Sequence, residues 1–569
     1  MIAILMNMFE KNKILFALIF LMVIQQRAHE MECQIPVDAS SVTKYTNTVS
    51  NKKRAFKSAR KYFRDYCENS SIIGFKYLGE RRTRGERLLW FVIVVTAIAL
   101  SVYYILEIYN KYEENPFIVN FATRESPISV IPFPAVTICP VVKASRKNFN
   151  FTEAVHNILD DISISEDKMR KTQYMSSVCA NNGDTYRQKL PLVDTFTEDF
   201  YDQLDSMKPN QHMMFVTCVM MDEEIYCVEK FNPIILDDGV CYSFNMLSRE
   251  DIYKDNVVHY RDYHQNLYST NWTNDDGYSK VIGADAYPYR AFLAGADSAL
   301  EMLLMQIEGD LDYLCAKDTE GFKVVLHTPH TVPRLKKQYI PVSWDSSLQV
   351  MVHPKMMTTS KEVKKFKPKD RLCYFSDERP LKYFKIYNPE NCELECLTNY
   401  TLKMCDCVDF YMPRDNSTKI CGNSKRRCVK RSLHDIKEFE LTSLLDGIFD
   451  VDSTCNCMPL CTEISYDVET SSTLYSWKKQ MQAERAITFL EEMYLLNVSE
   501  LHISKLSIFF KRDKFLTSQR NELYGPFDFL ANFGGLLGLF TGFSLLSAVE
   551  IFYFLTVRLW CNFMLDSNF

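Results

Sequence analysis

Hydrophobic residues gather in two long runs near opposite ends of the chain. The first run, Leu88–Leu106, has 19 residues and no charged side chain. At about 1.5 Å per residue it matches a hydrocarbon core roughly 30 Å thick, and Trp90 and Tyr103 near its ends suit the two interfaces. A buried core helix is the alternative, and it is disfavoured because every face of the run is apolar. The pattern therefore predicts a transmembrane helix.

The second run, about Phe527–Val557, is longer and less pure, because it contains Asp528, Asn532 and Glu550. It also holds four glycines, Gly534, Gly535, Gly538 and Gly542. Polar groups inside a membrane helix usually face a water-filled path or a partner helix. We therefore expect this span to line a polar path, and the first span to be an outer helix that faces lipid.

Charges beside the first run predict its orientation. Residues 51–87 carry 12 Lys or Arg against 4 Asp or Glu, a balance of +8, whereas acidic residues predominate just after the run. The positive-inside rule places the more basic side in the cytoplasm. The predicted organisation is a cytoplasmic N-terminal region 1–87, a first span 88–106, an extracellular domain 107–526, a pore-lining second span 527–557 and a cytoplasmic tail 558–569.

Cysteines test this topology independently. Three of the 19, Cys33, Cys67 and Cys561, fall on the predicted cytoplasmic side. The other 16 lie between the spans, and an even number is what a full disulfide framework outside the cell requires. The disulfide candidates are Cys139, Cys179, Cys218, Cys227, Cys241, Cys315, Cys373, Cys392, Cys396, Cys405, Cys407, Cys421, Cys428, Cys455, Cys457 and Cys461.

Asn-x-Ser/Thr sequons show the same bias. A single such triplet is weak evidence, and Asn69 heads one on the predicted inner side. Five others lie between the spans as candidate glycan sites, at Asn150, Asn271, Asn399, Asn416 and Asn497.

The segment Ile14–Ile24 conflicts with this topology. It is apolar, follows Lys11 and Lys13, and resembles the core of a signal peptide, which would place the following residues outside. Its 11 residues are too few to span a membrane. A signal, a membrane-surface segment and a non-functional N-terminus remain alternatives.

The region between the spans has mixed local patterns. The segment Ile128–Ile138 is β-branched and punctuated by prolines, which predicts strands or extended chain. Gly321–Val332 and Lys505–Phe510 are also predicted to be strands. Residues Thr473–Asn497 have helical periodicity. One face of that predicted helix collects Ala483, Ile487, Leu490, Met493 and Tyr494. With no internal repeat, the expected fold class is α+β, with two transmembrane helices flanking a large disulfide-rich extracellular domain.

The densest group of cysteines lies in Cys373–Cys461, with short spacings such as Cys392-x3-Cys396 and Cys455-x-Cys457. Paired cysteines at such spacing can bind zinc. Outside the cell, stacked disulfides that stiffen the module are the favoured interpretation, each contributing about 2–4 kcal/mol.

Enzymatic chemistry is not indicated. The chain has no Gly-x-Ser-x-Gly, no His-Glu-x-x-His and no phosphate-binding glycine loop. We expect His327 and His330 to be structural or surface residues, and the basic cluster Lys425–Arg431 to be a solvated loop. A net charge of −6 argues against a nucleic-acid partner. No cofactor and no metal site are expected.

Several longer motifs follow one another from about residue 70 to 557. They are FPAVTICP at Phe133–Pro140, GVCYSFN at Gly239–Asn245, GFKVVLHTPHTVP at Gly321–Pro333, the cysteine-bearing string at Arg371–Cys407, CNCMPLCTEISY at Cys455–Tyr466 and NFGGLLGLFTGFSLLSAVEIFYF at Asn532–Phe554. In the order and the sequence of these motifs, the chain resembles the degenerin/epithelial sodium channel/acid-sensing ion channel family, and most closely its insect pickpocket-type members.

The resemblance implies a subunit of a trimeric, Na⁺-preferring cation channel in the plasma membrane, homomeric or heteromeric, with both termini cytoplasmic. It implies amiloride block and Na⁺ as the permeant ion. The ectodomain would have a hand-shaped α+β fold, stiffened by disulfides, and an extracellular stimulus would move it to gate the pore.

The resemblance also assigns pore residues. Gly542, Phe543 and Ser544 fall on the family's Gly-x-Ser selectivity filter, although the middle residue there is usually Ala or Ser. Glu550 would form a ring of carboxylates in a trimer.

Near the outer gate the resemblance places Ala531, Asn532 and Gly535. Ala531 matches the degenerin position, where added bulk is expected to prevent closure.

Before the first span, residues 70–75 (SSIIGF) match the family's His-Gly gating motif. Ile73 replaces the histidine, whereas Gly74 remains and is suited to a tight turn in a re-entrant segment.

Other functions are compatible with parts of this pattern. A non-conducting regulatory or obligate heteromeric subunit, or a receptor, would keep the topology, and Phe543 and Ile73 favour it. A membrane-anchored extracellular enzyme would not need the polar second span. An ATP-gated channel would share the topology but would leave the motifs unexplained.

Overall fold

The computed structural model divides the chain into two units, Met1–Asn115 with Tyr524–Phe569, and Pro116–Leu523. We call the first the helical unit and the second the β-rich unit. The described residues are 61–560 apart from 115–116, 180–184, 261–262, 264–268, 270–271, 280–282, 284–285, 317–318, 447–454, 486–497 and 524. The predicted signal-like segment 14–24, Cys33 and Cys561 therefore lie outside the described residues.

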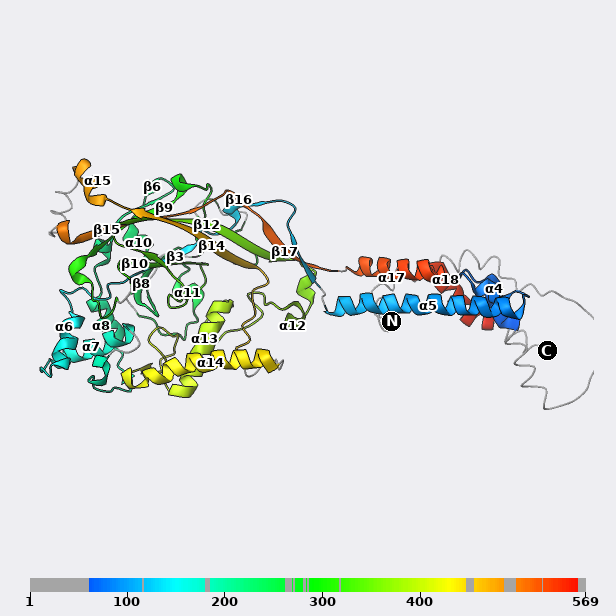
Figure 1. Cartoon of the computed structure of the whole chain (residues 1–569), viewed down its shortest axis with the longest axis horizontal. Coiled ribbons are helices and arrows are strands. Elements are labelled where there is room, and N and C mark those ends of the chain that lie inside the picture. The colour runs from blue at the N-terminus through cyan, green and yellow to red at the C-terminus, as the bar shows by residue number, and fades with distance from the viewer. Residues whose placement is uncertain are drawn as a thin grey trace, which may run out of the picture. The chain divides into compact units, whose positions relative to one another are not determined.

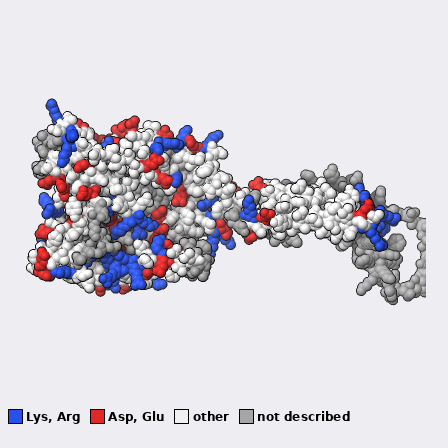
Figure 2. Space-filling model, in the orientation of Figure 1, with Lys and Arg blue, Asp and Glu red and all other residues white. Residues whose placement is uncertain are grey.

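The first apolar run forms one long helix of the helical unit (Figure 1). This helix, α5, covers Arg84–Glu114 and extends past the predicted span 88–106 at both ends. It is long and apolar enough to cross a membrane. Apolar side chains such as Leu88 and Phe91 are exposed on its surface, and Figure 2 shows few charges along the helices of this unit.

The second apolar run is not one straight helix. It forms α17 at Pro526–Thr541 and α18 at Leu545–Tyr553, followed by a π-helical turn at Phe554–Arg558. The two helical parts are bent by 70° at a short break, and together they are long and apolar enough for a second span. The predicted second span 527–557 therefore falls on two helices that are separated at residues 542–544.

The β-rich unit is built from two main sheets (Figure 1). The larger, eight-stranded sheet has the order β1-β17-β12-β15-β9-β5-β6, with β14 paired to β12. Its strands are β1 Phe117–Phe121, β5 Phe215–Met220, β6 Glu223–Glu224, β9 Leu300–Ile307, β12 Ser346–Thr359, β14 Glu463–Leu474, β15 Leu501–Phe510 and β17 Thr517–Glu522.

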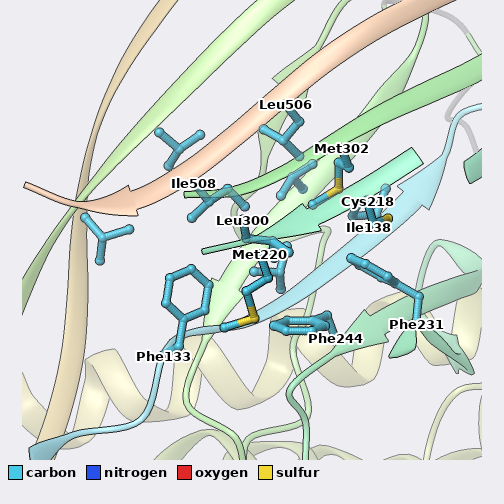
Figure 3. Close-up of a cluster of buried hydrophobic side chains, with 14 of the residues drawn as sticks. Phe133, Ile138, Cys218, Met220, Phe231, Phe244, Leu300, Met302, Leu506 and Ile508 are labelled. Atoms are coloured by element: carbon cyan, nitrogen blue, oxygen red, sulfur yellow. The ribbon is translucent and has the colours of Figure 1, made fainter. Parts of the chain in front are cut away.

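The second sheet has five strands in the order β11-β10-β3-β8-β7. They are β3 Ala135–Pro140, β7 Asn232–Leu236, β8 Gly239–Phe244, β10 Phe322–His327 and β11 Ile340–Val342. The main hydrophobic core collects side chains from both sheets (Figure 3). In β12, buried Leu348, Val350 and Val352 alternate with more exposed residues, as a strand with one covered face requires.

Helices lie outside the two sheets (Figure 1). The main ones are α6 Phe151–Leu159, α7 Glu166–Val178, α8 Phe200–Met207, α13 Pro389–Cys405 and α14 Arg426–Asp446. A single turn, α11, covers Arg249–Ile252. The basic cluster Lys425–Arg431 covers the end of a 3-10 turn and the start of α14, so the prediction of a loop is wrong. Arg427, Lys430 and Arg431 are exposed, and Figure 2 shows basic residues gathered in the region of α14.

The sequence predictions for local structure hold in part. The three predicted strands are confirmed in β3, β10 and β15, although Ile128–Val130 is a 3-10 turn. The predicted helix over Thr473–Asn497 is wrong at its start, because β14 continues to Leu474 by pairing along β12. Helix α15 covers only Trp477–Ala483, and residues 486–497 lie outside the described part.

All 16 cysteines of the β-rich unit are joined in eight disulfides. The pairs are Cys139–Cys241, Cys179–Cys315, Cys218–Cys227, Cys373–Cys461, Cys392–Cys457, Cys396–Cys455, Cys405–Cys428 and Cys407–Cys421. Five of them brace α13, α14 and their flanking loops, so these sulfurs bond to one another rather than offering thiolates to zinc. Cys67 is a free thiol in the helical unit.

Three of the five candidate glycan sites are described. Asn399 and Asn416 are exposed. Asn150 caps α6, because its side-chain oxygen accepts a hydrogen bond from the Glu153 amide at 3.0 Å. The sites at Asn271 and Asn497 lie outside the described residues.

Candidate functional site

The break in the second apolar run begins at Gly542. This residue ends α17 in the left-handed conformation, with φ of 64°, and its amide donates to the Gly538 carbonyl at 2.9 Å. Such a helix end favours glycine, because a Cβ atom there is strained. The sequence pattern singled out Gly542, but not the change of direction that it allows.

Ser544 starts the next helix. Its hydroxyl accepts a hydrogen bond from the Ser547 amide at 3.2 Å, while its own amide donates to the Ser547 hydroxyl at 3.1 Å. This reciprocal cap stabilises a new helix start directly after the old one ends. The three predicted filter residues therefore form the connection between α17 and α18, with Phe543 half-buried in the middle.

The predicted gating segment 70–75 lies against this break. The Ile73 amide donates to the Thr541 carbonyl at 3.1 Å. A Cβ atom added to Gly542 would lie 2.7 Å from both Cγ1 and Cδ1 of Ile73. The Ile73 side chain thus occupies the space that any larger residue at position 542 would need.

Gly74 makes the turn of this segment. Its φ is 96°, and it immediately precedes the short helix α4, Phe75–Gly79. A Cβ atom at this position would lie 2.6 Å from Cγ2 of Val94 in α5. Both the backbone conformation and the close approach to α5 therefore require glycine.

Glu550 is held by the same segment. Its Oε2 atom accepts hydrogen bonds from the Ser71 amide at 3.1 Å and from the Ser71 hydroxyl at 2.8 Å. The Ser71 and Ser547 hydroxyls are 2.8 Å apart. Sequence reasoning missed Ser71 and Ser547. The only indication in the sequence was indirect and concerned Ser547, which lies three residues from both Ser544 and Glu550.

The gate candidates lie in α17, on the N-terminal side of the break at Gly542. Ala531, Asn532 and Gly535 are all exposed within the single chain, and a Cβ atom at Gly535 would meet no heavy atom within 4 Å. Another side of α17 packs on α5, where the rings of Phe540 and Tyr104 stack at 5.9 Å. The described chain itself thus gives no steric reason for glycine at position 535.

The histidines of the β-rich unit do not belong to this site. His327 is buried at the end of β10, where Nδ1 donates to the Thr328 carbonyl and Nε2 lies 2.8 Å from the Thr137 hydroxyl. His330 is also buried, with Nε2 3.3 Å from the Asn274 amide nitrogen. Burial lowers the pKa of each histidine from 6.5 to about 4, which agrees with the expected structural role.

Acid should therefore destabilise this part of the fold. Between pH 6.5 and 4 the unfolded chain binds protons at His327 and His330 that the folded chain does not, so stability falls as pH falls. The expected loss at pH 5 is about 2 kcal/mol for each histidine. A lower thermal midpoint at pH 5 than at pH 7, with the pH dependence reduced in His330→Gln and unchanged in the exposed His434→Gln, would agree with this. An equal pH dependence in all three proteins would contradict it.

Comparison with known proteins identifies the family of the chain. Residues 66–554 match the family described as "Amiloride-sensitive sodium channel". Since the match covers most of the chain, the protein belongs to this family of sodium channel subunits. The predicted resemblance is thereby confirmed, and so is the prediction that the chain is not an enzyme.

Individual proteins of known name are also similar to this chain over most of its length. The chain is 29% identical over 504 residues to Pickpocket protein 28 of Drosophila melanogaster, covering 87% of this chain and 78% of that protein. It is 24% identical over 521 residues to Sodium channel protein Nach of the same fly, covering 89% of each chain. Acid-sensing ion channel 4-B of Danio rerio is 22% identical over 506 residues, covering 85% of this chain and 74% of that protein.

Proposed function

We propose that the chain is a pore-forming subunit of a Na⁺-preferring, amiloride-sensitive channel. It would lie in the plasma membrane with both termini in the cytoplasm. The observation that carries the proposal is the break at Gly542–Ser544, where one apolar run changes direction between two capped helices. Irregular backbone at membrane depth is tolerated where it lines a polar path, and its carbonyl groups can replace part of the water around a cation.

Small residues of α17, with Ala531 and Gly535 exposed and Gly538 half-buried, support an assembly of several subunits. Ala531, Gly535 and Gly538 recur at helical spacing, and a helix-interior glycine costs about 1 kcal/mol relative to alanine. Small residues let membrane helices approach closely. We propose that α17 packs around a central axis with copies from other subunits, three in all as in the resembled family.

Glu550 would then contribute one carboxylate from each subunit to a ring that concentrates cations. In the structure this carboxylate is bound by Ser71, which belongs to the segment before the first span. We propose that this arrangement couples the cytoplasmic segment to the filter. A displacement of residues 70–75 would then change both the conformation of the filter backbone and the position of the Glu550 carboxylate.

The β-rich unit supplies a lever for an extracellular stimulus. Strand β1 follows α5 in the chain and β17 precedes α17, and the two strands pair antiparallel from Phe117↔Glu522 to Phe121↔Ser518. β17 also pairs with β12, the long strand of the large sheet. A displacement of the large sheet would thus move both of the strands that lead to the predicted spans.

The first test is a substitution at the outer gate. Ala531→Val adds two methyl groups at an exposed position of the proposed packing face, so we expect it to obstruct the closed arrangement and to give a constitutive current. The measurement is voltage clamp on cells that express the chain, with external Na⁺ exchanged for K⁺ and amiloride added. A Na⁺-preferring, amiloride-blocked current would support the proposal. An unchanged current in a surface-expressed channel that still gates would contradict the role of Ala531.

A non-conducting partner subunit is the second candidate. Two departures from the family pattern favour it, namely Phe543 in the middle of the Gly-x-Ser motif and Ile73 in place of histidine. Silence of the Ala531→Val chain alone, despite surface labelling, followed by current on co-expression with a related subunit, would select this function.

A further inference from the structure

A cavity of about 120 Å³ lies in the β-rich unit. It is lined by α8, β7, the end of β8, the short helix α11 with the chain that follows it, and the loop 410–413 beyond α13. Figure 1 shows α8, α11 and β8 in the same part of this unit. The cavity is partly open to solvent, so a bound molecule can extend beyond this volume.

The walls are aromatic and are fixed by their own contacts. The Tyr201 hydroxyl donates to the Phe410 carbonyl at 2.8 Å, which joins α8 to the loop 410–413. The Val258 amide donates to the Arg414 carbonyl at 2.9 Å, which ties the chain after α11 to the same loop. A molecule in the cavity would therefore contact segments that are already positioned relative to one another.

The lining mixes apolar and polar side chains, and Tyr253 and His259 are two of the polar ones. The rings of Tyr253 and His259 meet edge-on at 4.7 Å, and Phe384 stacks on Tyr253 at 5.1 Å. Among the described residues, no hydrogen bond engages the Tyr253 hydroxyl or the ring nitrogens of His259. Both side chains are half-buried and border the cavity, so a ligand that hydrogen-bonds to them would take the place of water there.

The charges around the cavity favour a neutral ligand. Burial, with a smaller effect of the nearby Arg249, lowers the pKa of His259 to about 4, so its imidazole is neutral at physiological pH. Arg249 also lines the cavity, but it already pairs with Glu250 at 2.8 Å and donates to the Tyr260 carbonyl at 3.1 Å. An anionic group would therefore find a cation that is already neutralised.

We propose that this cavity binds a small neutral aromatic molecule carrying one hydroxyl group, which hydrogen-bonds to Tyr253 and His259. We further propose that its binding changes channel opening, and this second part rests on the proposed function. The ligand would bridge α8, the chain after α11 and the loop 410–413, which lies between α13 and the disulfide-braced start of α14.

Direct binding is the first test. The probe is 4-methylphenol, added to the full-length protein in detergent and followed by saturation-transfer NMR and equilibrium dialysis. We expect saturable binding, about tenfold weaker binding of toluene, which lacks the hydroxyl group, and no competition by benzoate, which is charged. Binding that does not saturate, or equal competition by benzoate, would overturn the proposal.

Substitutions locate the site. Val258→Phe fills the cavity and should abolish binding, whereas Tyr253→Phe and His259→Leu each remove one hydrogen-bonding group and should weaken binding about tenfold. Tyr226→Phe and His434→Gln are matched controls at exposed positions outside the cavity and should bind as the native protein does. If Tyr253→Phe and His259→Leu, both surface-expressed, retained native affinity, the proposal would be wrong whatever the fate of Val258→Phe.

Current recordings separate this proposal from the proposed function. Cavity-dependent binding of 4-methylphenol by a chain that never conducts, even with partner subunits, would support the site and overturn conduction. Intact binding together with an Ala531→Val current that is indifferent to 4-methylphenol would overturn the regulatory half of the proposal.

Discussion

Gly542→Ala should reduce the sodium current about tenfold at equal surface expression, measured in the Ala531→Val background. The left-handed conformation costs an alanine about 1–2 kcal/mol, which corresponds to roughly a 5- to 30-fold change in an equilibrium. The new Cβ atom would also lie 2.7 Å from two atoms of Ile73, so the cytoplasmic segment or the filter must move.

A double substitution separates the two causes. Ile73→Ala removes Cγ1 and Cδ1, the two atoms that the new Cβ atom meets, and leaves only the backbone strain. We therefore expect Gly542→Ala with Ile73→Ala to recover part of the current. Gly85→Ala is the matched control, because a Cβ atom at this position meets no heavy atom within 4 Å. A full-sized current with native ion preference in Gly542→Ala would show that the left-handed turn is not needed.

Ser71→Ala and Glu550→Gln should affect the channel differently, although they weaken the same contact. Ser71→Ala removes the hydroxyl donor, whereas the backbone amide at position 71 still donates to the Glu550 carboxylate, which keeps its charge. A hydrogen bond to a charged group contributes about 1.5–3 kcal/mol, and partial exposure to solvent reduces this toward 1 kcal/mol. We therefore expect the open probability to rise several-fold in single-channel recordings, with unitary conductance unchanged.

Glu550→Gln also removes one negative charge per subunit, so unitary conductance for Na⁺ should fall. Adding Ser71→Ala to Glu550→Gln should then change the open probability little, because the charge-assisted contact is already lost. Ser70→Ala is the control, since the Ser70 hydroxyl accepts a hydrogen bond from the Ile72 amide rather than binding Glu550. Fully additive effects of Ser71→Ala and Glu550→Gln would mean that the two side chains act independently.

In the helical region, local sequence patterns predict the spans but not the backbone conformation at the break or the contacts between distant segments. An apolar run of this length predicts a span, and its glycines and carboxylates predict a polar path. The pattern cannot show that Gly542 adopts a positive φ while Gly538 stays helical, because glycine is compatible with both. Nor can it show that Ser71 reaches Glu550, since these residues are 479 positions apart.

Local sequence patterns are also insufficient in the β-rich region. Thr473 and Leu474 fit a helical pattern, yet they lie in a strand because β12 offers hydrogen-bond partners along its whole length. The cysteine count predicted a complete disulfide framework, but spacing alone allows many connectivities. Cys392 and Cys396, one helical turn apart on α13, pair with Cys457 and Cys455 because α13 presents both to the same returning segment.

By itself the sequence determined two apolar runs, the even number of cysteines between them, the strand-forming segments and the motifs of the sodium channel family. These features depend on composition and on periodicity within one segment, which the chain carries whatever its fold. The tertiary structure alone decided the disulfide partners, the contact of residues 70–75 with the helix break, and the aromatic cavity. Each of these brings together residues far apart in the chain, and their meeting depends on how the sheets and helices pack.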